Sequence, residues 1–343
     1  MDIEPNETNR EPERPTLKTI AFMTGLGVTT VSRALKDAPD IGEDTKKRVR
    51  LVAAGIGYRP NRAGIRLRTG KTNVIGVILD TSEDSMGYVA AIVHGISERI
   101  RGTPYHLVIT PHSLSTDPME PVRYIVETGS ADGVILARTE PQDPRVAYLQ
   151  SHRMPFATHG RTLLPTPHAF YDFDNAAFAR IAVNRLVARG RTRIGLIAPP
   201  PALTFHRHMA EGLAQAVAAH RVIEVPLHGI ELDTRIDEVM QRAVALAQRE
   251  DMRPDGIVSA GGSAALAFVA GYETQGLKLG TDFDVVSKET MPLQHLYQPA
   301  LLTIPEDFRE AGRCLADAVL KAIEGGDPAQ LQMIATPAEG EES

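Results

Sequence analysis

Apolar residues near the start of the chain recur at the spacing of α-helices. Three short segments share this pattern, each with residues at helical spacing on one face: the apolar Leu17 and Ile20 with Thr24; Val28, Val31 and Leu35; Val49, Val52 and Ile56. Gly25 separates the first two segments, and Pro39 and Gly42 mark a loop before the third. Two short helices joined across a glycine-containing turn, with a third to close the core, are typical of a helix-turn-helix. The pattern therefore predicts an all-α helix-turn-helix domain over residues 16–60.

Beyond residue 72 the pattern changes to short continuous apolar runs that alternate with helical stretches. Each run is flanked by turn residues. The runs are Val74–Leu79, His106–Thr110, Gly133–Ala137, Phe156–Thr158, Ile194–Ala198, Gly256–Ala260 and Val285–Ser287. Helical spacing returns between the runs, in Tyr88–Arg101, Ala177–Arg189, Met209–His220, Ile236–Gln248 and Ala264–Gln275. Such alternation indicates parallel sheets with helices on both faces. We expect an α/β core of two doubly wound lobes over residues 73–331.

The remaining segments are expected to lie outside these two domains. Residues 1–15 are predicted to be a disordered tail, residues 61–72 a hinge or linker, and residues 332–343 a second tail. The last segment contains no leucine heptads, which argues against a tetramer held by a coiled coil.

Composition narrows the class of protein. Of the 343 residues, 43% are hydrophobic and 23% are charged, which is ordinary for a globular protein. The single cysteine, Cys314, cannot form an internal disulfide or a cysteine-based zinc site by itself. The chain has no run of about 18 apolar residues, and its acidic, proline-rich start is unlike a signal peptide. We therefore expect a cytoplasmic protein with no membrane partner.

Charge is distributed unevenly along the chain. Residues 1–15 carry a net charge of −3 and residues 16–71 a net charge of +8, which leaves −11 for the rest because the whole chain carries −6. A basic block on an acidic body indicates a module that binds a polyanion, although a solvated helix face would produce the same local charge.

The order of residues in the second predicted helix favours nucleic acid as that polyanion. If its apolar residues Val31 and Leu35 face inward, four polar residues project outward: Thr29, Ser32, Arg33 and Lys36. Ser and Thr hydroxyls bind phosphates, and an Arg can donate two hydrogen bonds to the edge of a guanine.

Three sequence motifs carry a resemblance to a known family. TVSR (30–33), GYRPN (57–61) and NVIGVI (73–78) stand at the spacing found in lactose-repressor (LacI) family transcription regulators, which the chain resembles over residues 16–330. The resemblance implies a periplasmic-binding-protein-like core behind the helix-turn-helix.

The resemblance also implies which residues touch DNA. The base-reading positions of the family fall on Val28, Thr29 and Arg33, and its phosphate-binding positions on Thr30 and Ser32. Val28 and Thr29 present methyl groups, so we expect contacts with thymine methyls, while Arg33 would contact guanine. Gly27 and Gly42 stand where the family commonly has helix-capping Ser, a change that costs only a few tenths of a kcal/mol.

The segment after Pro60 resembles the hinge helix of the family. Asn61 is a good N-cap, Arg62 and Arg66 can neutralise phosphates, and Leu67 matches the leucine that the family wedges into the minor groove. Gly64 replaces the usual Ala and weakens the helix by about 1 kcal/mol. A plain basic linker remains the alternative.

Polar and aromatic residues follow the predicted strands of the core. Ligands of parallel α/β folds bind at the carboxyl ends of strands. The candidate effector contacts chosen on this basis are Asp80, His159, Arg161, Asp174, Phe205, Arg207 and Lys288. Asp174 lies in FYDFDN (170–175), which matches a family motif that begins a helix near the cleft. Polar groups around an aromatic ring suit a polyhydroxylated ligand, so we expect a sugar.

Two departures from the family pattern restrict the ligand. Met209 stands where many members have an effector-binding Arg, and Gly261–Ser263 occupy a stretch where an Asp is common. A purine-type or strongly anionic effector held in the usual way is therefore disfavoured.

These observations predict a sequence-specific DNA-binding regulator, a repressor whose operator affinity is controlled by a sugar bound between the core lobes. It is expected to act without a cofactor or metal, as a homodimer on a pseudo-palindromic double-stranded DNA operator. An enzyme is not expected, because His206 and His208 lack a third metal ligand and no G-x-S-x-G motif is present. A solute-binding protein that shares the core, and a regulator of non-carbohydrate genes that uses a corepressor, remain as alternatives.

Overall fold

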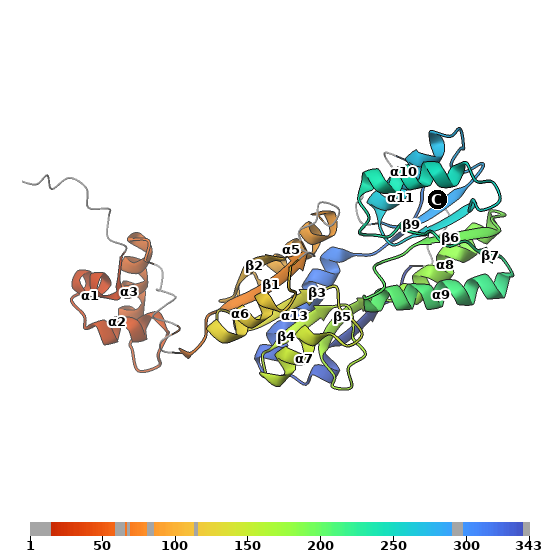
Figure 1. Cartoon of the computed structure of the whole chain (residues 1–343). Coiled ribbons are helices and arrows are strands. Elements are labelled where there is room, and N and C mark those ends of the chain that lie inside the picture. Colours follow the sequence, from red (N-terminus) through yellow and green to blue (C-terminus); the bar gives the residue numbers. More distant parts are fainter. Residues whose placement is uncertain are drawn as a thin grey trace, which may run out of the picture. The chain divides into compact units, whose positions relative to one another are not determined.

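The computed structural model describes residues 15–58, 66, 69–80, 86–112, 116–289 and 298–338 of the chain. The chain divides into two units, Met1–Thr72 and Asn73–Ser343 (Figure 1). The division coincides with the predicted start of the core. Within the described residues, no helix combines the length and apolarity needed to span a bilayer.

Residues 15–58 of the first unit form a bundle of three helices: α1 (Leu17–Thr24), α2 (Val28–Leu35) and α3 (Glu43–Gly55). Its core consists of buried apolar residues from all three helices, namely Ile20, Ala21, Val31, Ala34, Val49 and Ala53. Thr16 caps α1, and Gly25 ends it at φ 68°, a left-handed conformation that glycine adopts without strain. The predicted helix-turn-helix is confirmed, with Gly27 and Gly42 as the N-caps of α2 and α3.

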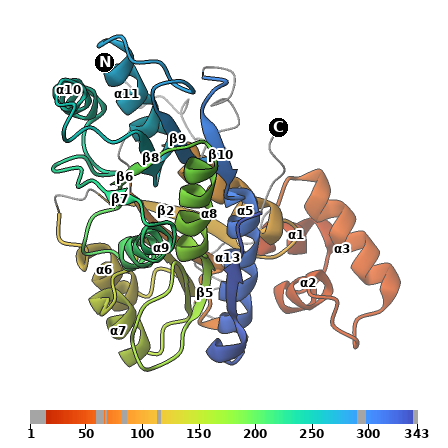
Figure 2. The same ribbon diagram turned by 90° about the vertical axis from the view of Figure 1, so that its right-hand side faces the viewer.

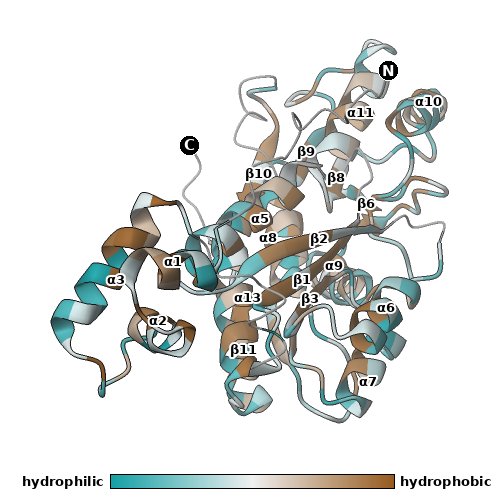
Figure 3. Ribbon diagram, turned by 90° about the vertical axis from the view of Figure 1, so that its left-hand side faces the viewer, coloured by the Kyte–Doolittle hydropathy of each residue, from teal (hydrophilic) through white to brown (hydrophobic). Residues whose placement is uncertain are grey.

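The first lobe of the second unit is built on a six-stranded parallel sheet in the order β11-β5-β4-β3-β1-β2. Its strands are β1 (Val74–Asp80), β2 (His106–His112), β3 (Gly133–Ala137), β4 (Phe156–His159), β5 (Ala169–Phe173) and β11 (Gln332–Ala335). Its helices are α5 (Met86–Ile100), α6 (Glu120–Thr128), α7 (Pro144–Ser151) and α13 (Phe308–Ile323). Hydrophobic residues line most of β1, β2 and β3 (Figure 3).

Alternation along β1 sends side chains into two apolar layers. Ile75 and Val77 pack with residues of α5 and α13, whereas Ile78 packs with residues of α6 and α7. Helices therefore cover both faces of the sheet, as the continuous apolar runs predicted.

The second lobe repeats this arrangement on a five-stranded parallel sheet in the order β10-β9-β8-β6-β7. Its strands are β6 (Arg193–Ile197), β7 (Ile223–Glu224), β8 (Gly256–Ser259), β9 (Asp284–Glu289) and β10 (Leu302–Pro305). The helices α8 (Asn175–Ala188) and α9 (Thr204–His220) pack on one face, and α10 (Ile236–Ala247) and α11 (Gly262–Glu273) on the other. The predicted α/β core of two doubly wound lobes is confirmed.

Helices α5 and α13 lie side by side and approach each other through glycines (Figure 2). A Cβ atom on Gly95 of α5 would overlap the carbonyl oxygen of Arg309, and one on Gly312 of α13 would overlap the carbonyl oxygen of Ile92. The absence of side chains at these two positions brings the two helix backbones into direct contact.

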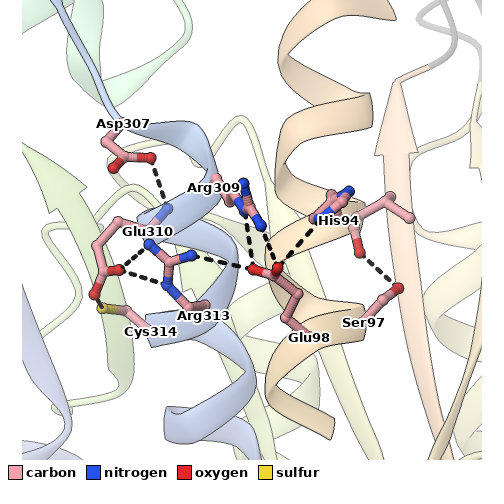
Figure 4. Close-up of polar contacts among 9 residues, drawn as sticks. His94, Ser97, Glu98, Asp307, Arg309, Glu310, Arg313 and Cys314 are labelled. Carbon is pink, nitrogen blue, oxygen red and sulfur yellow. Dashed lines mark hydrogen bonds and ion pairs between the residues drawn. The ribbon is translucent and has the colours of Figure 1, made fainter. Parts of the chain in front are cut away.

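Polar side chains at the rim of the same contact join the two helices. Glu98 of α5 accepts hydrogen bonds from Arg309 and Arg313 of α13, and lies 3.3 Å from His94 Nε2 (Figure 4). The hydrogen bond from Arg309, together with that from Arg313, lowers the pKa of Glu98 to about 2, so its carboxylate stays ionised at any physiological pH.

The structure departs from the sequence prediction at the C-terminus. Residues 332–335 were expected to belong to a tail, but they form β11, which pairs with Phe170–Phe173 of β5. The core therefore extends beyond Leu331, because this short strand completes the sheet at its edge.

Candidate nucleic-acid interface and ligand cleft

The second helix of the first unit presents the predicted base-reading residues on its outer face. Val28, Thr29 and Arg33 are exposed, with Val28 retaining 41% of its accessible surface, whereas Thr30 and Ser32 are half-buried. Val31 and Ala34 alternate with them and are fully buried. Of the residues predicted to project outward from α2, Thr29, Arg33 and Lys36 are exposed, whereas Ser32 is half-buried.

Several cations of the basic block are engaged within the unit. Lys46 Nζ lies 3.1 Å from Asp37 and 2.8 Å from Glu43, and Arg50 Nη2 donates to Asp37. Arg48 donates to the carbonyl oxygen of Thr24 at the end of α1. These contacts hold the helices together, so the net charge overstates the number of cations free to contact phosphates.

Most of the predicted hinge lies outside the described residues. This applies to Asn61, Arg62 and Leu67, whose proposed contacts therefore stay predictions. Arg66 is helical and exposed, and its carbonyl oxygen accepts a hydrogen bond from the Gly70 N–H at 2.8 Å.

A cavity of about 140 Å³ lies between the two lobes of the second unit. It is lined from the first lobe at the carboxyl ends of β3, β4 and β5, and from the second lobe near the carboxyl ends of β8 and β9. This is the position at which parallel α/β folds bind ligands. The volume accommodates a small organic molecule rather than one or two waters.

The cavity contains some of the predicted effector contacts and not others. His159, Phe205 and Lys288 line it. Asp80 is the last residue of β1, and its side chain lies outside what the structure describes. The other three predicted residues, Arg161, Asp174 and Arg207, are not among the lining residues.

Each of those three is held by another group. Arg161 Nε lies 2.9 Å from Asp172 Oδ2. Asp174 caps α8 by accepting a hydrogen bond from the Ala177 N–H, and Arg207 pairs with Glu211 one turn along the exposed face of α9. Their roles as effector contacts stay predictions.

A buried ion pair forms part of the cavity wall. Lys288 Nζ lies 2.6 Å from Glu306 Oε2, and His159 Nε2 lies 3.4 Å from Glu306 Oε1. Lys288 also sits over the ring of Phe173, 4.6 Å from its centroid. Burial raises the pKa of Glu306, but the charges of Lys288 and His159 outweigh it and hold that pKa well below its usual range.

Asp172, which sequence reasoning did not single out, lines the cavity with an unsatisfied acceptor. It is only 4% exposed, and burial raises the pKa of its carboxyl to about 6 despite the opposing charge of Arg161. Its Oδ2 atom accepts no hydrogen bond from any described residue, although Arg161 Nε lies 2.9 Å away in an ion pair. Asn175 Oδ1, also in the lining, is likewise buried without a partner among the described residues.

A second ion pair bridges the lobes beside the cavity. The guanidinium of Arg138, after β3 of the first lobe, forms a two-pronged contact with Asp233 of the second lobe; its Nη1 lies 3.1 Å from Oδ1. Such fork-like pairing fixes both side chains. Next to it, the Thr204 N–H donates to the carbonyl oxygen of Thr139 across the lobe boundary.

Comparison with known proteins agrees with both units. Residues 16–61 match the family described as "Bacterial regulatory proteins, lacI family", and residues 183–340 match the "Periplasmic binding protein-like domain". The HTH-type transcriptional regulator AglR of Rhizobium meliloti is 30% identical over 320 residues, covering 90% of this chain and 87% of AglR. RafR of Escherichia coli, also named an HTH-type transcriptional regulator, is 30% identical over 333 residues, covering 94% and 96% of the two chains.

Solved structures share the fold. The lac repressor dimer bound to operator and the anti-inducer ONPF superimposes with a TM-score of 0.80 at 22% identity, covering 95% of this chain and 97% of that one. The complex of the transcriptional regulator CelR with cellobiose gives a TM-score of 0.68, also at 22% identity, with coverages of 95% and 98%. The family assignment rests on the sequence relatives, and it makes this chain a DNA-binding transcriptional regulator that belongs to the LacI family.

Proposed function

We propose that the protein is an operator-binding repressor whose affinity for DNA is set by an uncharged sugar bound between the lobes of the core. The charge balance of the cavity is the observation that carries this proposal. Arg138 and Lys288, the permanent cations among the lining residues that the structure describes, are each paired with a carboxylate, Asp233 and Glu306 respectively. A phosphate or carboxylate on the ligand would find no uncommitted cation among the described lining residues.

The lining groups that lack a hydrogen bond suit hydroxyls, which both donate and accept: Asp172 and Asn175 offer acceptors, and the buried Arg138 Nε–H offers a donor. Asp172 Oδ2, which lies in an ion pair 2.9 Å from Arg161 Nε, and Asn175 Oδ1 are buried acceptors that receive no hydrogen bond from the described residues, and a buried acceptor without a hydrogen bond costs about 1–3 kcal/mol. A sugar hydroxyl can donate to each, which removes that cost. Phe205 and Phe308 add ring faces on which the apolar face of a pyranose can pack.

The regulator is proposed to act as a homodimer on a pseudo-palindromic operator. One α2 per protomer reads one half-site, and a two-fold dimer matches the symmetry of such DNA. The related structures support both parts of the proposal, since one contains a lac repressor dimer on its operator and another a regulator bound to cellobiose.

Ligand screening of the full chain tests the effector. Neutral mono- and disaccharides, the corresponding sugar phosphates and uronic acids, and nucleosides are compared by their shift of the thermal midpoint. At a hundredfold excess over the dissociation constant, a specific ligand stabilises by about 2.7 kcal/mol. We expect a neutral sugar to do so; stabilisation by charged sugars or nucleosides alone would reject the proposal.

Two variants distinguish cleft binding from binding elsewhere. Asp172→Ala removes the lining acceptor and should abolish the shift, whereas Glu211→Gln changes an exposed carboxylate on α9 outside the cavity and should leave it unchanged. The ligand is then added to the protein on operator DNA selected from a random library. Release of DNA supports a repressor relieved by its ligand, and tighter binding would instead establish a corepressor.

A further inference from the structure

The loop between α2 and α3 brings an acidic side chain against the predicted base reader Arg33. Arg33 Nη2 lies 2.6 Å from Asp40 Oδ1, and both side chains remain about half exposed, at 53% and 50%. This pairing was not anticipated from the sequence, which suggested only that Arg33 points outward.

A tight turn produces the contact. Asp37 takes a left-handed conformation at φ 60° after the end of α2, and the Ala38 N–H donates back to the carbonyl oxygen of Arg33 at 3.1 Å. Pro39 restricts the next φ, and the Ile41 N–H closes the turn onto the Ala38 carbonyl. The backbone therefore returns Asp40 to the C-terminal end of α2, where Arg33 lies.

Two other acids of this region, Asp37 and Glu43, are bound by different cations. Asp37 takes Lys46 and Arg50, and Glu43 takes Lys46. Asp40 forms its close ion pair with Arg33, whose hydrogen bond lowers the pKa of the Asp40 carboxyl. Asp40 therefore remains ionised beside the outer face of α2.

A carboxylate at this position has a cost and a benefit. Its charge repels DNA phosphates, which weakens binding to any sequence. However, the Asp40 carboxylate occupies only one of the five N–H donors of the Arg33 guanidinium. The remaining N–H groups of the planar fork can still donate two hydrogen bonds to the edge of a guanine. A flexible Arg has many rotamers, and the contact with a carboxylate on a hydrogen-bonded turn favours those that keep the guanidinium beside Asp40.

We propose that Asp40 is a positioning residue for DNA reading: it orients the Arg33 guanidinium, and the guanine preference of each half-site depends on this contact. The proposal rests on the assignment of Arg33 as a base reader. It predicts opposite changes on removing the Asp40 charge, with tighter binding to DNA in general and weaker discrimination for guanine. If the Asp40 carboxylate only competed with DNA for Arg33, it would lower the discrimination for guanine, and removing the carboxylate would raise that discrimination.

The test uses the full-length chain and a library of double-stranded DNA with a random central segment. Bound fractions are sequenced for the wild type, Arg33→Ala, Asp40→Asn and Asp44→Asn. Asp44 is the matched control, because it is an exposed acid in the first turn of α3 and its substitution makes the same change in charge. Arg33→Ala identifies the base position that Arg33 reads. Thermal midpoints establish that all four proteins are folded.

We expect both Asn variants to bind unrelated DNA more tightly, and only Asp40→Asn to reduce the preference for guanine at that position, by about two- to fivefold, the range of an exposed ion pair. Asp40→Glu, which retains the carboxylate, should restore part of the preference. An unchanged or increased preference in Asp40→Asn overturns the proposal. If Arg33→Ala alters no base preference, the assignment of Arg33 fails and the role of Asp40 with it, while the response of the core to sugars is measured independently.

Discussion

The buried pair Lys288–Glu306 offers a quantitative test of how the cleft is held together. Both side chains are almost inaccessible, at 6% and 2%, and their charged atoms lie 2.6 Å apart. Glu306 lies between β10 and α13, where the chain passes from the second lobe to the first, and Lys288 lies on β9. Each charge is stable in this environment only because the other compensates it.

Removing one partner should therefore destabilise the core strongly. Glu306→Gln leaves a buried ammonium, and Lys288→Met leaves a buried carboxylate with only His159 beside it. Breaking a buried pair in this way typically costs about 3–5 kcal/mol. In the double variant Lys288→Met/Glu306→Gln no buried charge remains, so we expect it to cost less than either single substitution.

The measurement is urea unfolding followed by far-ultraviolet circular dichroism, because the chain has no tryptophan to report by fluorescence. The four proteins form a double-mutant cycle whose coupling term isolates the pair. Lowering the pH tests the same interaction. The pKa of Glu306 is depressed in the folded state, so the contribution of its ionised carboxylate to the free energy of unfolding is complete above the unfolded pKa near 4.5. That contribution is lost as the pH falls from this value through the lower pKa of the folded state. Single variants within about 1 kcal/mol of wild type, or a double variant equal to the sum of the singles, would refute the reasoning.

Two further tests rest on contacts in the structure, and a third, on Leu67, rests on the sequence. Gly95→Ala should lower the thermal midpoint, because the added methyl group forces α5 away from the Arg309 carbonyl. The control Ala90→Gly, on the exposed surface of α5, should cost only about 1 kcal/mol in helix propensity. Equal losses of stability in the two variants would contradict close packing of α5 against α13. Effector affinity, measured by calorimetry, should fall as pH decreases through about 6, because a hydroxyl donor favours the ionised form of Asp172; a flat profile from pH 5 to 8 would exclude that contact. Leu67→Ala should weaken operator binding in gel shifts more than binding to unrelated DNA, as a minor-groove wedge requires, and equal losses would remove that assignment.

The sequence predicted those strands whose pattern of apolar residues is contained within the strand itself. Continuous apolar runs gave seven strands of the two sheets to within two residues at either end, since a strand buried on both faces needs apolar side chains at every position. Strand β5 was missed, because Asp172 interrupts its apolar run, whereas the helix predicted to begin at the end of FYDFDN is present, with Asp174 as the N-cap of α8. Strand β11 was missed because its place beside β5 depends on a pairing across more than 150 residues, which no local pattern contains.

The candidate ligand site was predictable in part for the same reason. The rule that ligands bind after parallel strands identified His159 and Lys288, which the structure places in the lining. The rule did not identify Glu306, the residue that pairs with both, because Glu306 lies 18 residues after Lys288 where the chain crosses between the lobes. Arg207 was chosen from its position in a polar segment, yet the helical repeat of α9 directs it to Glu211 on the exposed face.

The position of the unsatisfied acceptors bears on how a ligand could influence DNA binding. A ligand shifts a conformational equilibrium only by its difference in affinity for the two states, and such couplings are typically 1–3 kcal/mol. Asp172 belongs to the first lobe, Asn175 begins the first helix after the crossing to the second, and Lys288 and Phe205 belong to the second. A sugar that contacts all four groups at once can do so in one relative arrangement of the lobes. Substitutions of Asp172 should therefore reduce both the affinity for the sugar and the change in DNA affinity that it causes, because the same contact provides both.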